Sequence, residues 1–301
     1  MYDTSVLHAA AILALTLVGC APRLCPLPQP CHRWSDAITA SQCEGQDHTY
    51  RSSRAEEQAR ERELFAQLFA AARKGRAEVE ALAPVAARHG LRFIICSDTV
   101  VVAEEPTARH GRGAYVIALG DASELFIQVP HSFTDLRTFE MGIEMFAASH
   151  ARALAVSTVP RDAKADVAHD PSSMFQSVTA AWLAVTPQDP IVQLHGFGDT
   201  RVFADAVVTS GASERGAPWL LAIRDRLRAL LPGRIIAAFP DDVNDLGATT
   251  NSQGHIVRAT GGRFLHIEMS ASLRESLRRR DADRRKFLDE LAASLLPSVQ
   301  R

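Results

Sequence analysis

Apolar positions change from helical to strand-like spacing near residue 90, and from there the two patterns alternate along the chain. Helical spacing predicts helices over residues 54–73 and 76–87, and again over 136–149, 173–185 and 217–230, with two charged helices at the C-terminus. Short β-branched runs bounded by turn residues predict strands at 93–105, 114–120, 125–130, 153–158, 191–196, 203–211, 234–240 and 264–270.

Near-continuous apolar strands separated by helices are typical of a mainly parallel sheet that is covered on both faces. The chain shows no internal repeat and no second compositional region after residue 51. We therefore expect one α/β domain with a mainly parallel, mixed sheet flanked by helices, over residues 51–301.

Composition narrows the class of function. The 301 residues are 47% hydrophobic and 23% charged, which excludes disordered, collagen-like and coiled-coil proteins. The formal net charge of −2 leaves no basic excess to neutralise a phosphate backbone, so we expect no nucleic-acid partner. We therefore expect an enzyme or a protein that binds a small ligand, rather than a nucleic-acid-binding protein.

The N-terminus predicts a lipoprotein. Residues 9–18 form an apolar run that is too short to span a bilayer but has the length of a signal h-region. Leu17-Val18-Gly19-Cys20 resembles a bacterial lipobox, although no Lys or Arg precedes the run. We expect a signal peptide over 1–19, lipidation of Cys20 and a tether over 20–50, which would anchor the domain in the membrane of a bacterial cell envelope. A buried N-terminal helix is the alternative.

Four further cysteines are Cys25, Cys31, Cys43 and Cys96. In an oxidising compartment they permit two disulfides in any of three connectivities, and the sequence does not choose among these. Paired CxxC spacing, which a zinc ribbon would need, is absent from the sequence. Disulfides are therefore expected rather than a cysteine-bound metal.

Polar side chains at the ends of the predicted strands suggest a site, because ligands of open α/β sheets bind at the carboxyl ends of the strands. His131 and Asp135 follow the strand at 125–130, and His195 ends the strand at 191–196. Imidazole and carboxylate groups both suit Zn²⁺. The alternatives are a hydrogen-bonded structural histidine at either position and a helix N-cap at Asp135.

A carboxylate within the last predicted strand points to catalysis. Strand alternation places His266 and Glu268 on one face. A carboxylate in so apolar a run is costly unless it is paired, protonated or functional. It is either a general base beside a metal-bound water or the partner of an arginine such as Arg274.

Taken together, the segments PHSFTD, QLHGFG and HIEMSASLR resemble the zinc carboxypeptidase superfamily, over roughly residues 90–295. The resemblance is to its N-formylglutamate amidohydrolase and poly-γ-glutamate hydrolase branches. It implies a Zn²⁺ cofactor held by His131, Asp135 and His195, with Glu268 as the general base. The chain departs from the peptidase branch in having HxxxD where that branch has HxxE, which keeps Glu140 as an alternative ligand.

The resemblance also implies an arginine that holds a substrate carboxylate. Arg161 matches the arginine of the family's Asn-Arg pair, without the asparagine, and Arg274 is the other candidate. Asp166 and His169 are candidates for a ligand, for an orienting partner of a metal-bound histidine or for a cap, and Asn251 is a candidate binding residue.

The sequence thus predicts a zinc-dependent hydrolase of amide or peptide bonds that acts on a small molecule or peptide bearing a carboxylate. The alternative is an envelope lipoprotein that uses the same fold only to bind a ligand.

Overall fold

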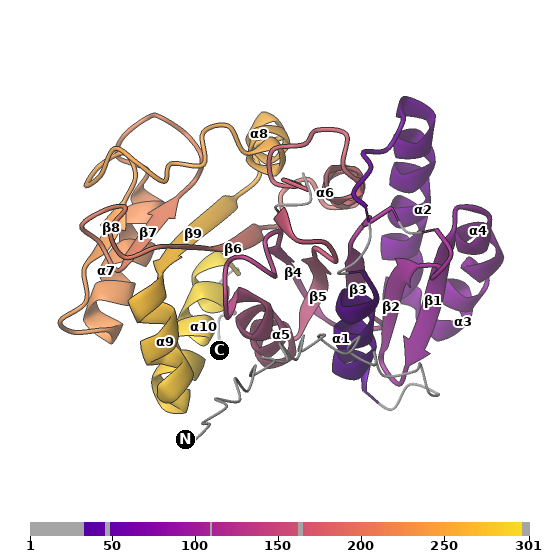
Figure 1. The fold of residues 1–301 in the computed structure, drawn as a ribbon, viewed down its shortest axis with the longest axis horizontal. Coiled ribbons are helices and arrows are strands. Elements are labelled where there is room, and N and C mark those ends of the chain that lie inside the picture. The colour runs from indigo at the N-terminus through magenta and orange to yellow at the C-terminus, as the bar shows by residue number, and fades with distance from the viewer. Residues whose placement is uncertain (1–32, 46–48, 109, 162–164, 297–301) are drawn as a thin grey trace, which may run out of the picture.

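A computed structural model describes residues 33–45, 49–108, 110–161 and 165–296 (Figure 1). Several predicted features lie outside these ranges: the signal peptide, the expected lipidation site at Cys20, and the two cysteines Cys25 and Cys31. The lipid anchor and the envelope location therefore stay predictions. No helix in the described ranges is long and apolar enough to cross a membrane.

The described part of the chain contains ten helices and nine strands. The helices are α1 (Trp34–Gly45), α2 (Ala55–Lys74), α3 (Arg76–Glu80), α4 (Ala83–Arg88), α5 (Thr138–Ser149), α6 (Met174–Val185), α7 (Pro218–Leu230), α8 (Ser252–Ala259), α9 (Ala271–Arg279) and α10 (Asp281–Leu295). The strands are β1 (Leu91–Cys96), β2 (Thr99–Glu104), β3 (Ala114–Ala118), β4 (Ser123–Val129), β5 (Ala151–Val156), β6 (Ile191–Phe197), β7 (Ala206–Thr209), β8 (Ile236–Ala238) and β9 (Phe264–Ser270).

All nine strands form one sheet in the order β1-β2-β3-β5-β4-β6-β9-β7-β8. The four central strands β5, β4, β6 and β9 are parallel to one another, as are β7 and β8. The other neighbouring pairs are antiparallel. The predicted α/β domain with a mixed sheet is therefore confirmed, with the parallel pairing concentrated at its centre.

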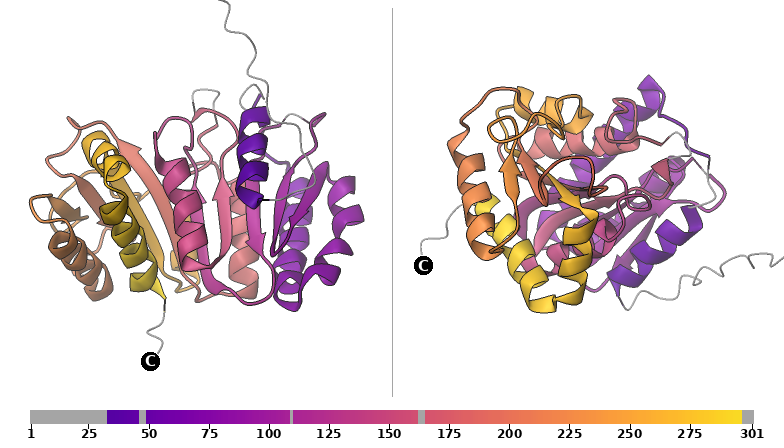
Figure 2. Two further views of the ribbon diagram at one scale, coloured as in Figure 1. Left: turned by 90° about the horizontal axis from the view of Figure 1, so that it is seen from below. Right: turned by 60° about the vertical axis from the view of Figure 1, so that its left-hand side comes forward.

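Helices cover both faces of the sheet (Figure 2). Strand alternation divides most of the buried apolar side chains between two large cores, one under α1, α5, α7, α9 and α10 and the other under α2, α3, α4, α6 and α8. A small third cluster contains Phe197, Val207, Ala237 and Leu246. In β4, Ile127 and Val129 belong to the first core while Phe126 belongs to the second. Residues at even positions of β4 and β9 and at odd positions of β6 therefore face α6 and α8.

Three segments differ from the prediction. The run expected as one strand over 93–105 is the hairpin β1–β2, because the polar pair Ser97-Asp98 forms a two-residue turn between Cys96 and Thr99. Part of the expected tether is helix α1, whose Ile38 is fully buried against the sheet. The polar stretch before β9 contains α8, which begins at the side-chain cap of Asn251.

Cys43 of α1 and Cys96 of β1 are both disulfide-bonded. These two cysteines are thus structural, as expected, and neither is a metal ligand.

Candidate metal centre

Polar side chains replace apolar ones toward the carboxyl ends of β6 and β9. His195 is directly opposite Glu268 in the parallel register, and Gln193 is opposite His266. All four side chains point to the face covered by α6 and α8, because apolar residues of both strands alternate with them. The sheet therefore brings His195, His266 and Glu268 together, as their spacing predicts.

The segment after β4 brings His131 and Asp135 to the same place. A tight turn joins them, in which the Asp135 amide donates to the His131 carbonyl at 2.9 Å. The Asp135 carboxylate accepts a hydrogen bond from the Gly196 amide at 3.0 Å, at the end of β6. The N-cap of α5 is Arg137, so the interpretation of Asp135 as a simple cap is wrong.

Two imidazoles and one carboxylate converge on a common point. Asp135 Oδ2 lies 3.4 Å from His131 Nδ1 and 3.4 Å from His195 Nδ1. Zinc bonds of about 2.0–2.1 Å in a tetrahedron place neighbouring ligand atoms about 3.3 Å apart. His131 Nδ1 is buried and has no hydrogen-bond partner in the described part of the chain. These donors therefore fit a zinc ion in both chemistry and spacing.

A second set of possible ligands, His195, His266 and Glu268, also clusters within 4.8 Å. The rings of His195 and His266 are stacked, with centroids 4.3 Å apart and an interplanar angle of 27°. Nitrogen lone pairs lie in the ring plane, so those of stacked rings point side by side and do not converge on one ion. His131, Asp135 and His195 are therefore the better candidate ligand set.

The outer nitrogens of both histidines are already hydrogen-bonded. His131 Nε2 lies 3.0 Å from Asp166 Oδ1, and His195 Nε2 lies 2.8 Å from Gln193 Oε1. A metal-bound histidine usually donates its other N–H to such an oxygen, which fixes the ring and leaves the facing lone pair for the metal. Asp166 is thus the orienting partner of His131, one of the roles that the sequence left open.

The charges within the site are set by burial and by the neighbouring groups. Burial lowers the pKa of His195 to about 4, with the nearby His266 contributing in the same direction. Burial alone would raise the pKa of Asp135, but its contacts with His131 and His195 hold that pKa well below its usual range. The site therefore presents a neutral imidazole beside a carboxylate anion at neutral pH.

Glu268 lies beside this group of donors. Its Oε1 is 3.4 Å from His266 Nε2, while its Oε2 is buried and has no hydrogen-bond partner among the described residues. Burial would raise the pKa of Glu268, but His266 and His195 lower it below its ordinary value. The carboxylate is therefore ionised and has a free oxygen with which to accept a proton.

The donors open onto a cavity of about 230 Å³. His131, His195, His266 and Glu268 line its floor, and the segment from Asp245 to Asn251 forms part of its wall. Such a volume is enough for a small molecule or the end of a peptide, but it is below the usual range for drug-sized ligands.

Two arginines stand on the wall of the cavity. Arg161 donates to Asp166 at 2.6 Å, and Arg201 donates to Asp245 at 3.1 Å. About half of each side chain is exposed. Arg161 therefore lines the cavity, and its role in binding a substrate carboxylate stays a prediction. Arg201 was missed, because it lies on a loop whose sequence carries no periodic pattern.

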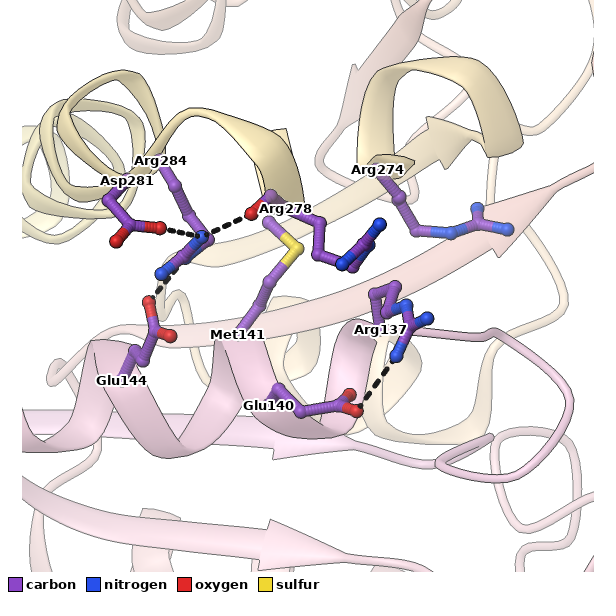
Figure 3. Close-up of a pocket in the computed structure, with 8 residues that line it drawn as sticks. All are labelled: Arg137, Glu140, Met141, Glu144, Arg274, Arg278, Asp281 and Arg284. Atoms are coloured by element: carbon purple, nitrogen blue, oxygen red, sulfur yellow. Dashed lines mark hydrogen bonds and ion pairs between the residues drawn. The ribbon is translucent and has the colours of Figure 1, made fainter. Parts of the chain in front are cut away.

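Arg274 lies outside this cavity. Its side chain is buried over the backbone of Gly196, where a Cβ would overlap the guanidinium, and it donates to the carbonyls of Met269 and Phe197. Together with Arg278 it lines a separate cavity whose opposite wall is α5 (Figure 3). The structure does not bring Arg274 to the cavity beside the histidines, because its guanidinium lies on the carbonyls of Met269 and Phe197 at the ends of β9 and β6.

Glu140, the alternative ligand, also lies away from the site. It belongs to α5, is 56% exposed and pairs with Arg137 in the separate cavity (Figure 3). The candidate group with His131 and His195 therefore contains Asp135 and not Glu140.

No protein-family model and no curated protein matches the sequence. Solved structures do match. An N-formylglutamate amidohydrolase from Ralstonia eutropha is 14% identical with a TM-score of 0.41, covering 62% of this chain and 98% of that one. A bacteriophage poly-γ-glutamate hydrolase is 13% identical with a TM-score of 0.36, covering 57% and 81%. A metallo-carboxypeptidase from Burkholderia cenocepacia is 13% identical with a TM-score of 0.37, covering 60% of each chain.

Proposed function

We propose that this chain is a zinc-dependent hydrolase of amide or peptide bonds. The observation that carries the proposal is the convergence of His131 Nδ1, His195 Nδ1 and Asp135 Oδ2, while the outer nitrogens of both rings are tied to other side chains. Three protein ligands of this kind are typical of catalytic zinc sites, which keep one position open.

A zinc ion held there would polarise a carbonyl group and lower the pKa of a coordinated water from ~15.7 to about 7. In this proposal Glu268 would accept the proton of the attacking water and deliver it to the leaving amine. Its Oε2 has no hydrogen-bond partner among the described residues, and Glu268 lines the cavity together with His195 and His266. A positioned general base of this kind accelerates a reaction by about 10²–10⁴-fold.

The wall of the cavity favours a substrate with a carboxylate. Arg161 and Arg201 both reach the cavity, and a guanidinium binds a carboxylate through two parallel hydrogen bonds. Each arginine also pairs with an aspartate, which holds the guanidinium at the wall. We therefore propose small N-acyl amino acids and short peptides with a free carboxylate as the substrate class.

A hydrolysis assay on a panel of N-acyl amino acids and dipeptides tests this function. We expect turnover that a chelator abolishes and that stoichiometric zinc restores. Amidation of the substrate carboxylate should lower kcat/KM. Turnover that survives complete removal of metal would contradict the proposal.

Replacement of Arg161 or Arg201 by methionine should raise KM with little change in kcat. The loss of one charged hydrogen-bonding partner costs about 1.5–3 kcal/mol, or roughly 10–150-fold in affinity. Arg279→Met is the control, because Arg279 is exposed on α9 and pairs with Glu275. If neither cavity variant changes KM, the carboxylate is not bound by these arginines.

Replacement of Asp166 by asparagine should weaken zinc binding by about 10–100-fold without abolishing it, as is usual for partners of a metal-bound histidine. The amide keeps the size of the carboxylate but weakens the hydrogen bond that orients His131. A competition titration with a zinc chelator measures the change. An affinity equal to that of the wild type would show that Asp166 does not orient His131.

A further inference from the structure

Behind His195, between the sheet and the helices α6 and α8, lies a group of buried side-chain amides. Gln128, Gln193 and Gln253 are fully buried, and Asn251 is 1% exposed. Buried amides are costly unless they are hydrogen-bonded, so an apolar core would be expected here. The proposed metal ligands and the proposed base Glu268 do not explain why four buried amides lie here.

Gln193 is at the centre of this amide network. Its Oε1 accepts a hydrogen bond from Asn251 Nδ2 at 2.6 Å and lies 2.8 Å from His195 Nε2. Its Nε2 donates to Gln128 Oε1 at 2.9 Å and to Gln253 Oε1 at 3.2 Å. The oxygen and the nitrogen of the Gln193 amide therefore have two hydrogen-bond partners each.

Backbone groups that can only donate or only accept a hydrogen bond determine which end of the Asn251 and Gln253 amides faces Gln193. The Gly254 backbone N–H donates to Asn251 Oδ1 at 2.8 Å, so the amino group of Asn251 is the side that faces Gln193. Gln253 donates to the backbone carbonyl of Val167 at 3.1 Å, so its oxygen faces Gln193.

The hydrogen bonds of Gln128 require the same orientation of Gln193. The Thr179 hydroxyl donates to the Phe175 carbonyl at 2.8 Å and therefore accepts from Gln128 Nε2 at 2.9 Å. The oxygen of Gln128 consequently faces Gln193 Nε2. Three independently anchored chains of hydrogen bonds thus require Gln193 to present its oxygen to His195.

We infer that Gln193 is a positioning residue, which the amide network orients so that it holds His195 as the Nε2–H tautomer. The opposite tautomer would bring two lone pairs to within 2.8 Å of each other in a buried site. In the tautomer that the network selects, Nδ1 carries a lone pair and no proton for Asp135 Oδ2, 3.4 Å away, which accepts from the Gly196 amide instead. The use of that lone pair for zinc rests on the proposed function, whereas the tautomer itself does not.

The experiment compares Gln193→Met with Gln128→Met. Both glutamines are fully buried on neighbouring strands, opposite each other in the register, but only Gln193 touches His195. Long-range nitrogen–proton spectra of histidine-labelled, metal-free protein at neutral pH report which ring nitrogen carries the proton, and the His195→Ala variant identifies the signal. Zinc affinity is measured in parallel.

We expect Nε2–H at His195 in the wild type and in Gln128→Met, with zinc affinities within about threefold of each other. In Gln193→Met the signal should shift to a mixture of tautomers, and zinc affinity should fall by about 10–100-fold. Both variants lose buried hydrogen bonds, so a loss of stability alone does not produce this difference.

Protonation at Nδ1 in the metal-free wild type would overturn the inference, and this readout does not depend on whether either variant folds. An unchanged tautomer in folded Gln193→Met would also overturn it. If the wild type shows the Nε2–H tautomer but binds no zinc, the proposed function fails while the tautomer assignment stands.

Discussion

Replacement of Glu268 by glutamine is expected to lower kcat by about 10²–10⁴-fold while zinc stays bound. Glutamine keeps the shape of the side chain but cannot accept a proton at neutral pH. Glu268 is not among the three groups assigned to the metal, so the metal content should equal that of the wild type. Steady-state kinetics on any cleaved amide, together with elemental analysis, measures both quantities.

Glu140→Gln is the matched control. Glu140 is the other carboxylate that the sequence offers near the site, but it lies on α5 and faces a separate cavity. We expect this variant to keep wild-type turnover. Full activity in Glu268→Gln would show that another group accepts the proton.

Replacement of Asp135 by asparagine is expected to weaken zinc binding by about 10³-fold. Zinc in protein sites is bound by about 10–16 kcal/mol, so the loss of one of three ligands costs roughly 4 kcal/mol. The amide keeps the size of the side chain and can still accept from the Gly196 N–H, so the turn after β4 should be retained.

The comparison with Asp166→Asn makes this prediction specific. Both aspartates contact His131, but only Asp135 also contacts His195. Chelator competition should give a much larger loss for Asp135→Asn than for Asp166→Asn. Equal losses in the two variants would place Asp135 among the orienting residues and not among the ligands.

The convergence of most of the candidate metal-site residues could be predicted from the sequence because it depends on two regular features. The carboxyl ends of parallel strands meet at one edge of a sheet, and alternate residues of a strand share a face. These two rules bring together His131, His195 and Glu268 from segments about 60–70 residues apart in the sequence. The sheet's parallel centre, β5-β4-β6-β9, supplies that geometry.

The residues that the sequence misplaced or missed lie where no periodic rule applies. Arg274 follows β9 closely in the sequence, but the first turn of α9 directs it to the backbone of Gly196. Arg201 reaches the cavity from an irregular loop. Neither position follows from strand or helix spacing.

The amide network did leave a signal in the sequence. Gln128 and Gln193 interrupt two strands that are otherwise strongly apolar, on the same face as the histidines. A fully buried glutamine needs partners for both ends of its amide, which suggests a network. Which atoms meet in that network depends on α6 and α8, and their packing could not be derived from spacing.

The zinc content of the purified chain, reconstituted with zinc and compared with its His195→Ala variant, tests the metal centre most directly. The geometry of His131, Asp135 and His195 predicts one tightly held zinc per chain, which the variant loses. A wild-type chain that holds no zinc after reconstitution, or a variant that keeps it in full, would contradict the assignment of the site.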